Sequence, residues 1–349
     1  MKRYIYPILF LLLFALVACS TDSAGTGTAT AKLHDGKKAE DPGKITVMKI
    51  GSTVKADIAL GKAEDKFKEV VERETNGSIK VEVFHDSQLG GERDIMEGIQ
   101  IGTVQGGAVG TAVASNFSPR FGLWSLPFLF PDSNTSYRIL DGPIGQEVLD
   151  DLEDIGIIGF NYWESGIRNL TNNSKEIKLP NDLSGLKIRT LESQIQLDIW
   201  TELGALPTPM AFPELFTSLQ QGVVDGQENP YSVVASSKFY EVQKYLTETA
   251  HLIGVNAFMV NKDFFEGLTD AEQAAIKKAA TEAQDFQREE KALEDADFKE
   301  LLIEKGMIIS SLTQEERQKW VDKVAPVYNK YKKEIGSELV DKLLEEIQK

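Results

Sequence analysis

Three segments of the 349-residue chain mix charged residues with apolar and turn residues in neither a helical nor a strand period: 163–171, 183–190 and 203–230. In the second, Arg189 ends a short predicted strand and directly precedes a predicted helix. Ligands bind at the carboxyl ends of strands in open α/β sheets, and a guanidinium there can donate two parallel hydrogen bonds to a carboxylate. A surface salt bridge is the alternative role for a single arginine. Arg189 is therefore a candidate carboxylate-binding residue.

Patterns typical of catalytic and metal sites are missing from the sequence. The three histidines, His34, His85 and His251, are isolated from one another, and the last two are expected at surface or turn positions. There is no HExxH, CxxC, GxSxG, GxxxxGK or GxGxxG motif. No spacing singles out two carboxylates as an acid–base pair. We therefore expect no enzymatic activity, no metal and no cofactor.

The balance of charge excludes several classes of partner. Lys and Arg total 38 and Asp and Glu total 54, which gives a net charge of −16. Basic patches supply most of the affinity for nucleic acids and for anionic membrane surfaces, so neither is an expected partner. The single cysteine allows no disulfide framework inside the chain and no thiolate metal cluster.

The N-terminus has the pattern of a secretory signal peptide over residues 1–18. A basic start precedes an apolar run that is too short for a comfortable transmembrane helix. The run stops at Cys19, and Leu16-Val17-Ala18-Cys19 resembles a bacterial lipobox. That resemblance implies cleavage before Cys19 and lipidation of its sulfur; a plain signal peptide with an incidental cysteine is the alternative. The leader holds two basic residues and no acid, so its loss changes the net charge from −16 to −18.

Residues 19–43 are rich in small and polar residues and predict a flexible tether after the lipidated cysteine. We therefore expect a folded body outside the cytoplasmic membrane, attached to that membrane through a lipid anchor only.

The body alternates between strand-like and helix-like patterns. Strands are predicted at 45–50, 79–84, 104–113, 156–162 and 185–190, and helices at 56–74, 92–101, 143–155, 193–203, 231–246 and 336–348. This alternation favours an α/β fold with mostly parallel sheets. Two capping-box patterns, at Thr269 and Thr313, each predict a helix start, and the first opens a long helix to about residue 305. Such a helix either crosses two lobes or packs on one.

Several blocks of sequence, in one order, carry a family resemblance over about residues 45–330. They are Gln88-Leu89-Gly90-Gly91-Glu92-Arg93, Leu126-Pro127-Phe128-Leu129-Phe130, Asp141-Gly142-Pro143-Ile144-Gly145, the stretches ending at Arg189 and Phe212, Asp225-Gly226-Gln227-Glu228-Asn229-Pro230 and Glu241-Val242-Gln243-Lys244-Tyr245-Leu246. Together they resemble the DctP-type substrate-binding proteins of TRAP (tripartite ATP-independent periplasmic) transporters. The resemblance implies a two-lobe, periplasmic-binding-protein-like (Venus flytrap) α/β fold with a long helix spanning both lobes. We expect lobe I at 45–165 plus 255–295 and lobe II at 166–254 plus 296–349.

The resemblance also implies a set of ligand-binding residues. The arginine that matches Arg189 binds the ligand carboxylate bidentately, and the one that matches Arg168 is a second cation near the ligand. The asparagine that matches Asn229 hydrogen-bonds to the ligand, and the aromatic residue that matches Phe212 packs on it. Two further residues match positions that line the cleft in some members, Glu92 and Trp163.

The implied function is the capture of a small organic acid and its delivery to the integral membrane subunits of a TRAP transporter, by a protein we expect to be a monomer. Glu92 and Trp163-Glu164 resemble members that bind sugar acids such as uronates or aldonates, which favours that class; C4-dicarboxylates are the alternative. A secreted hydrolase and a structural lipoprotein are alternatives from other classes. Because the Debye length is about 8 Å at physiological salt, remote acidic residues do not prevent two cleft arginines from binding an anion.

Overall fold

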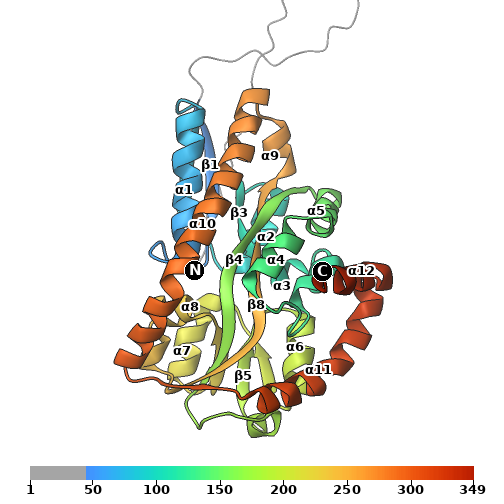
Figure 1. The fold of residues 1–349 in the computed structure, drawn as a ribbon. Helices are drawn as coiled ribbons and strands as arrows, with labels where there is room; N and C mark the ends of the chain where they lie inside the picture. The colour runs from blue at the N-terminus through green and yellow to red at the C-terminus, as the bar shows by residue number, and fades with distance from the viewer. Residues whose placement is uncertain (1–44) are drawn as a thin grey trace, which may run out of the picture. The chain divides into compact units, whose positions relative to one another are not determined.

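The computed structural model describes residues 45–349, so the predicted leader, Cys19 and the tether lie outside the described part of the chain. The described residues form one nine-stranded mixed sheet with strand order β2-β1-β3-β8-β4-β7-β5-β6, and β9 pairs with β8. Helices cover both sides of this sheet (Figure 1). No helix within 45–349 is long and apolar enough to cross a membrane.

One end of the sheet, the first lobe, is built from β1 (Thr46–Gly51), β2 (Ile79–Phe84) and β3 (Gly106–Gly110), with α1 (Ala59–Glu74) and α2 (Glu92–Ile101) in the connections. Both β2 and β3 pair with β1 in parallel, as expected for strands joined through helices. The alternate apolar residues of β2 and the apolar face of α1 pack into the same core, in which Phe67 and Val81 are fully buried.

The other end, the second lobe, contains β5 (Lys187–Thr190), β6 (Leu206–Pro209) and β7 (Gly226–Asn229), with α6 (Gln194–Glu202), α7 (Leu215–Gln220) and α8 (Tyr231–Ser236). Here β5 pairs in parallel with both β6 and β7. The carboxyl end of β5 therefore presents Arg189 just before α6, as predicted from the sequence.

Two long strands run through both lobes: β4 (Ile157–Asn172) and β8 (Tyr245–Asn261). They pair antiparallel with each other, β8 pairs antiparallel with β3, and β4 pairs antiparallel with β7. The prediction of mostly parallel sheets is therefore wrong for the centre of the molecule. The predicted helix over 231–246 is also wrong beyond residue 236, because the chain turns at residues 237–244 and then enters β8.

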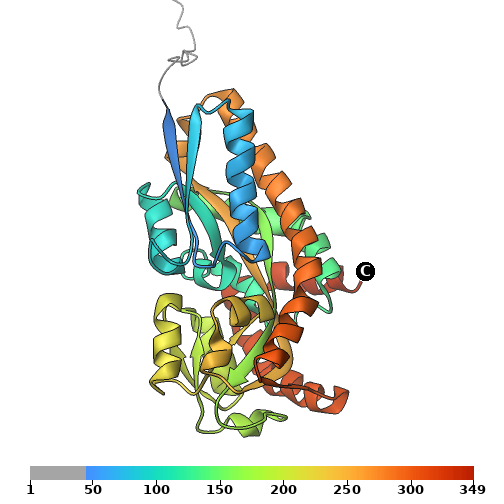
Figure 2. The same ribbon diagram turned by 90° about the vertical axis from the view of Figure 1, so that its left-hand side faces the viewer.

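A third crossing is made by α10 (Asp270–Glu304), which runs past α1 of the first lobe and on toward α8 of the second (Figures 1 and 2). Its 35 residues give a rod of about 50 Å at ~1.5 Å per residue. The predicted capping box is confirmed: Thr269 Oγ1 accepts from the Glu272 N–H, and the Glu272 carboxylate accepts from the Thr269 N–H. Along this helix, Glu294 also accepts the N–H of Ala59 at 2.8 Å and so caps the first turn of α1.

The helix predicted after Thr313 is α11 (Gln314–Ile335), and α12 (Ser337–Ile347) follows it. The remaining elements are α3 (Thr111–Ala114), η1 (Pro119–Ser125), α4 (Ser133–Leu140), α5 (Pro143–Asp150), η2 (Asp151–Ile155), η3 (Pro180–Leu183), η4 (Phe212–Glu214), η5 (Phe239–Glu241), α9 (Lys262–Glu266) and β9 (Ile308–Ser311).

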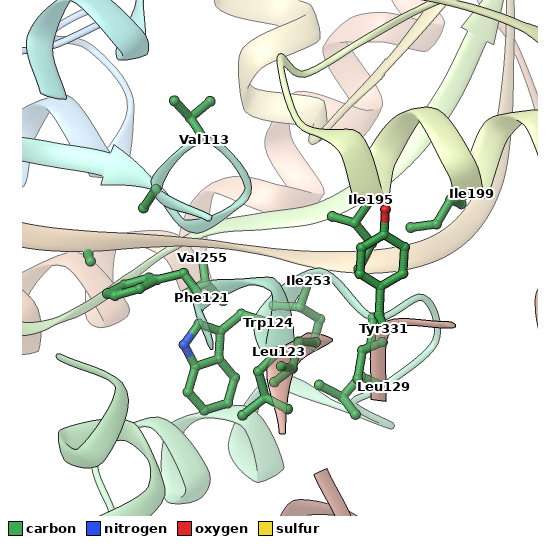
Figure 3. Close-up of a cluster of buried hydrophobic side chains, with 14 of the residues drawn as sticks. Val113, Phe121, Leu123, Trp124, Leu129, Ile195, Ile199, Ile253, Val255 and Tyr331 are labelled. Atoms are coloured by element: carbon green, nitrogen blue, oxygen red, sulfur yellow. The ribbon is translucent and has the colours of Figure 1, made fainter. Parts of the chain in front are cut away.

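The largest apolar core joins elements that are far apart in sequence. Figure 3 shows Phe121, Leu123 and Trp124 of η1 gathered with Ile253 and Val255 of β8, with Ile195 and Ile199 of α6 and Tyr331 of α11 close by. Side chains contributed from α6, β8 and α11 thus fix η1, the short helix that follows β3 and α3. The two-lobe α/β fold is confirmed; the exact lobe boundaries stay a prediction.

Candidate ligand-binding site

A cavity lies where the two lobes meet, around β4 and β8. Its wall includes residues from the first lobe and its connections, from the second lobe and from both long strands, among them Thr53, Glu92, Gly110, Thr111, Ser125, Arg168, Arg189, Glu192, Phe212, Asn229 and Asn256. Five of the six predicted site residues are therefore brought together, although they are spread over 138 residues of chain from Glu92 to Asn229.

Hydrogen bonds join the connection after α3 to the connection after β5 beside this cavity. The side-chain amide of Asn116 donates to the Glu192 carbonyl at 2.6 Å, and the hydroxyls of Ser115 and Ser193 lie 3.3 Å apart. These contacts link the segment that follows β3 to the second lobe, so the structure shows the two walls in contact.

Arg189 is 2% exposed, and one nitrogen of its guanidinium group makes no hydrogen bond. Its Nε and Nη2 donate to the carbonyl of Met210 at 3.0 and 2.7 Å, but Nη1 is buried with no hydrogen-bond partner in the protein. Burial lowers the pKa of Arg189 to about 10, which the charge of Glu228 partly opposes. A buried cation with an unpaired donor on a cavity wall is suited to receive an anion.

Arg168 is also buried, but its charge is in an ion pair with Glu228. Its Nε and Nη2 donate to the Glu228 carboxylate at 2.5 and 2.8 Å, and Nη2 also donates to the Glu228 carbonyl at 2.7 Å. His251 Nε2 lies 3.2 Å from the same carboxylate. Burial alone would raise the pKa of Glu228, but Arg168 and His251 together lower it to about 2. The charge of Arg168 is therefore neutralised inside the protein.

Glu92 reaches the cavity from the first turn of α2. Its Oε1 accepts the N–H of Gly110 at 3.1 Å, and a Cβ at position 110 would lie 2.8 Å from its Oε2. Glycine at 110 is thus what allows the carboxylate to approach the end of β3. Burial raises the pKa of Glu92, although the Gly110 N–H and the two arginines oppose the shift.

Phe212 and Asn229 lie beside the arginines. The Phe212 ring centroid is 5.9 Å from Arg189 Cζ, within the range of a cation–π contact. Asn229, at the end of β7, is paired with Asn169 of β4 and donates its side-chain amide to Gln227 at 2.5 Å. Both side chains line the cavity.

Trp163 is the exception among the predicted site residues. It is fully buried, its ring stacks on Phe258 with centroids 4.7 Å apart, and its indole N–H donates to Asn161 at 2.9 Å. It packs in the core under α1 and α10 and does not line the cavity. The alternation of β4 turns this residue toward the core, so the expectation that it lines the cleft is wrong.

The two histidines of the body are also not simple surface residues. His251 is 1% exposed and bound to Thr249 and Glu228. Burial lowers the pKa of His85, but the neighbouring carboxylates of Glu64 and Asp65 raise it to about 8. Both histidines pair with acidic residues that are distant in sequence, which no local pattern reveals.

Comparison with known proteins identifies the family. A family model described as bacterial extracellular solute-binding protein, family 7 (DctP) matches residues 50–334. This chain belongs to that family. A solute-binding protein of Verminephrobacter eiseniae is 37% identical over 85% of this chain and 88% of its own length. The C4-dicarboxylate-binding periplasmic protein DctP of Rhodobacter capsulatus is 34% identical over 84% and 89%, respectively.

Solved structures show the same fold. The sugar acid binding protein DctPAm of Advenella mimigardefordensis, in complex with galactonate, is 38% identical with a TM-score of 0.85, covering 87% of this chain and 98% of that one. A TRAP periplasmic solute binding protein of Sulfurospirillum deleyianum with bound succinate is 31% identical with a TM-score of 0.83, covering 86% and 98%. The chain is thus an extracytoplasmic solute-binding protein of the TRAP type that binds small organic acids and works with membrane permease subunits. The hydrolase and structural-lipoprotein alternatives are wrong.

Proposed function

We propose that this protein captures a hydroxylated monocarboxylate, a sugar acid such as an aldonate or uronate, in preference to a C4-dicarboxylate. The observation that carries the proposal is the ion pair of Arg168 with Glu228, which leaves Arg189 as the arginine of the cavity wall, among the described residues, that is in no ion pair. One such cation suits one carboxylate.

The charges around the cavity support the same class. Glu228 compensates Arg168 in a direct ion pair, whereas Glu192, which lines the cavity, makes no ion pair with Arg189. A second ligand carboxylate would meet no uncompensated positive charge there. Glu92, by contrast, offers carboxylate oxygens, which bind hydroxyl groups well and repel anions.

The proposed roles follow the geometry. Arg189 donates to the ligand carboxylate, Asn229 hydrogen-bonds to it and Phe212 packs against its carbon atoms, while Glu92 accepts from hydroxyl groups. Micromolar affinity corresponds to about −8 kcal/mol, and a charged hydrogen bond contributes roughly 1.5–3 kcal/mol, so this small set is sufficient. We further propose that the protein acts as a monomer held to the membrane by a lipid on Cys19.

Titration calorimetry at pH 7 with galactonate, erythronate, glucuronate, malate, succinate and fumarate tests the proposed substrate class. We expect one of the first three to bind at least tenfold more tightly than succinate. A C4-dicarboxylate as the tightest ligand would overturn the proposed class. Mass spectrometry of the protein isolated from membranes tests the lipid on Cys19.

A further inference from the structure

Two buried polar groups on the cavity wall have no partner in the protein. Among the described residues that line the cavity, these are Nη1 of Arg189 and the hydroxyl of Ser125. Arg189 is accounted for by the ligand carboxylate. Ser125 has no role so far, and it comes from a different part of the chain, the last residue of η1.

The surroundings of Ser125 make an unpaired hydroxyl costly. The residue is 1% exposed, and its neighbours in sequence, Trp124 and Leu126, are buried in the largest apolar core. Figure 3 shows the side chains of η1 packed against Ile253 and Val255 of β8, two residues that also line the cavity. A buried hydroxyl left without a hydrogen bond is unfavourable, so a ligand that supplies the partner gains affinity.

The packing of η1 also holds Ser125 in place. Trp124 donates its indole N–H to the Tyr162 hydroxyl at 3.2 Å, and Tyr162 in turn donates to the Gly145 carbonyl at 3.0 Å. A hydroxyl fixed by such a framework loses little conformational entropy when it binds, which is the property of a specificity-determining group.

We propose that Ser125 is a hydroxyl-binding residue of the ligand site and that it contributes to the selection of hydroxylated acids. This inference rests on the proposed function and deepens it. The two unpaired groups together require a ligand with a carboxylate for Arg189 and a hydroxyl for Ser125. A hydroxyl group pairs with Ser125 as donor or as acceptor, whereas the methylene of a deoxy acid leaves it unpaired.

Ser125→Ala tests the proposal, with Ser232→Ala as its matched control. Ser232 in α8 is fully buried and also lacks a hydrogen-bond partner, but it does not line the cavity. Calorimetry is run with galactonate, erythronate, glucuronate and succinate on the wild type and both variants. Ser125→Cys, which keeps a weak donor of similar size, is measured beside them, and each melting temperature reports folding.

We expect Ser125→Ala to weaken the tightest hydroxylated ligand at least fivefold and succinate less than twofold, with Ser125→Cys in between and Ser232→Ala unchanged. Equal losses for hydroxylated acids and succinate, or no loss for either, would overturn the role of Ser125 while the proposed function stands. A wild type that prefers succinate would overturn both, so the two failures are distinguishable.

Discussion

Arg168 and Arg189 are both buried in the same cavity wall, yet their environments are opposite. Arg168 makes three hydrogen bonds to Glu228, whereas Arg189 donates only to the Met210 carbonyl and keeps one donor unpaired. The charge of Arg168 is compensated without a ligand, whereas the charge of Arg189 is paired directly only when an anion binds. A buried arginine thus takes a structural or a ligand-binding role according to what already satisfies it, and its position in a sequence motif does not distinguish the two.

Replacing the partner of Arg168 should have the largest effect. Glu228→Gln removes the carboxylate charge and leaves Arg168 buried without a counterion, so we expect the free energy of unfolding to fall by about 3 kcal/mol. Urea unfolding measures it. The exposed pair of Arg138 and Glu346 provides the control, because Glu346→Gln should cost less than about 1 kcal/mol.

Glu228→Gln also tests, through ligand selectivity, whether the difference between Arg168 and Arg189 sets the ligand class. Glu228→Gln frees the charge of Arg168, so the affinity for succinate relative to galactonate should rise. A stable Glu228→Gln protein with unchanged selectivity would show that the pairing of Arg168 does not set the ligand class.

Arg189→Ala should abolish most binding without loss of stability. We expect the dissociation constant of the tightest acid to rise at least tenfold, and Arg189→Lys to do the same, because lysine lacks the planar fork. The melting temperature of the free protein should not fall, since a buried and incompletely paired cation is removed. Arg138→Ala is the control for binding, and an unchanged affinity in folded Arg189→Ala would remove Arg189 from the site.

Lowering the pH should reduce the contribution of the Arg168–Glu228 pair to the free energy of unfolding. The folded-state pKa of Glu228, about 2, lies below the value near 4.5 expected when unfolded, so its contribution is present above pH 4.5 and is lost as the pH falls toward 2. Between pH 5.5 and 3.5 the wild type should lose about 1.4 kcal/mol more than Glu228→Gln, the equivalent of one pKa unit. Parallel urea curves at the two pH values check this, and equal losses would contradict it.

Phe212→Leu should have the smallest effect. It removes the ring beside Arg189 but keeps an apolar side chain, so we expect affinity to fall about two- to fivefold, in line with ~0.5–1 kcal/mol for a cation–π contact. Phe216→Leu is the matched control, because Phe216 also packs against the ring of Phe239 but does not line the cavity. If both variants bind alike, the ring of Phe212 contributes nothing specific.

Local signals in the sequence were sufficient to predict elements outside the two central strands. The alternation of residues 79–84 predicted β2, and the capping boxes at Thr269 and Thr313 predicted the starts of α10 and α11. The two central strands were predicted poorly. β8 is buried almost throughout, so its sequence lacks the apolar–polar alternation of a strand with one solvent-exposed face. Residues 231–246 also have an apolar spacing that is compatible with a helix.

The site was predictable only as a list of positions. The family resemblance implied Arg189 as the bidentate carboxylate-binding residue and Arg168 as a second cation near the ligand. The partner of Arg168 lies 60 residues away, and no local spacing reveals that pairing. Ser125 was missed because a serine at the end of a short apolar helix carries no pattern; its meaning depends on Val255 and Ile253, which arrive from β8. Trp163 shows the opposite error, since its side of β4 is set by packing.

The central strands also constrain how the chain can fold. The side chain of Asn256 in β8 donates to the carbonyl of Ala108 in β3 from 148 residues further along the chain, and β8 is the strand that joins β3 to β4. Until residue 261 has emerged during synthesis or translocation, β3 and β4 remain open edges, exposed to pairing with other chains. A fragment that ends before β8 therefore leaves one edge of β3 and one edge of β4 unpaired. We expect such a C-terminally truncated fragment to aggregate rather than to form a smaller domain.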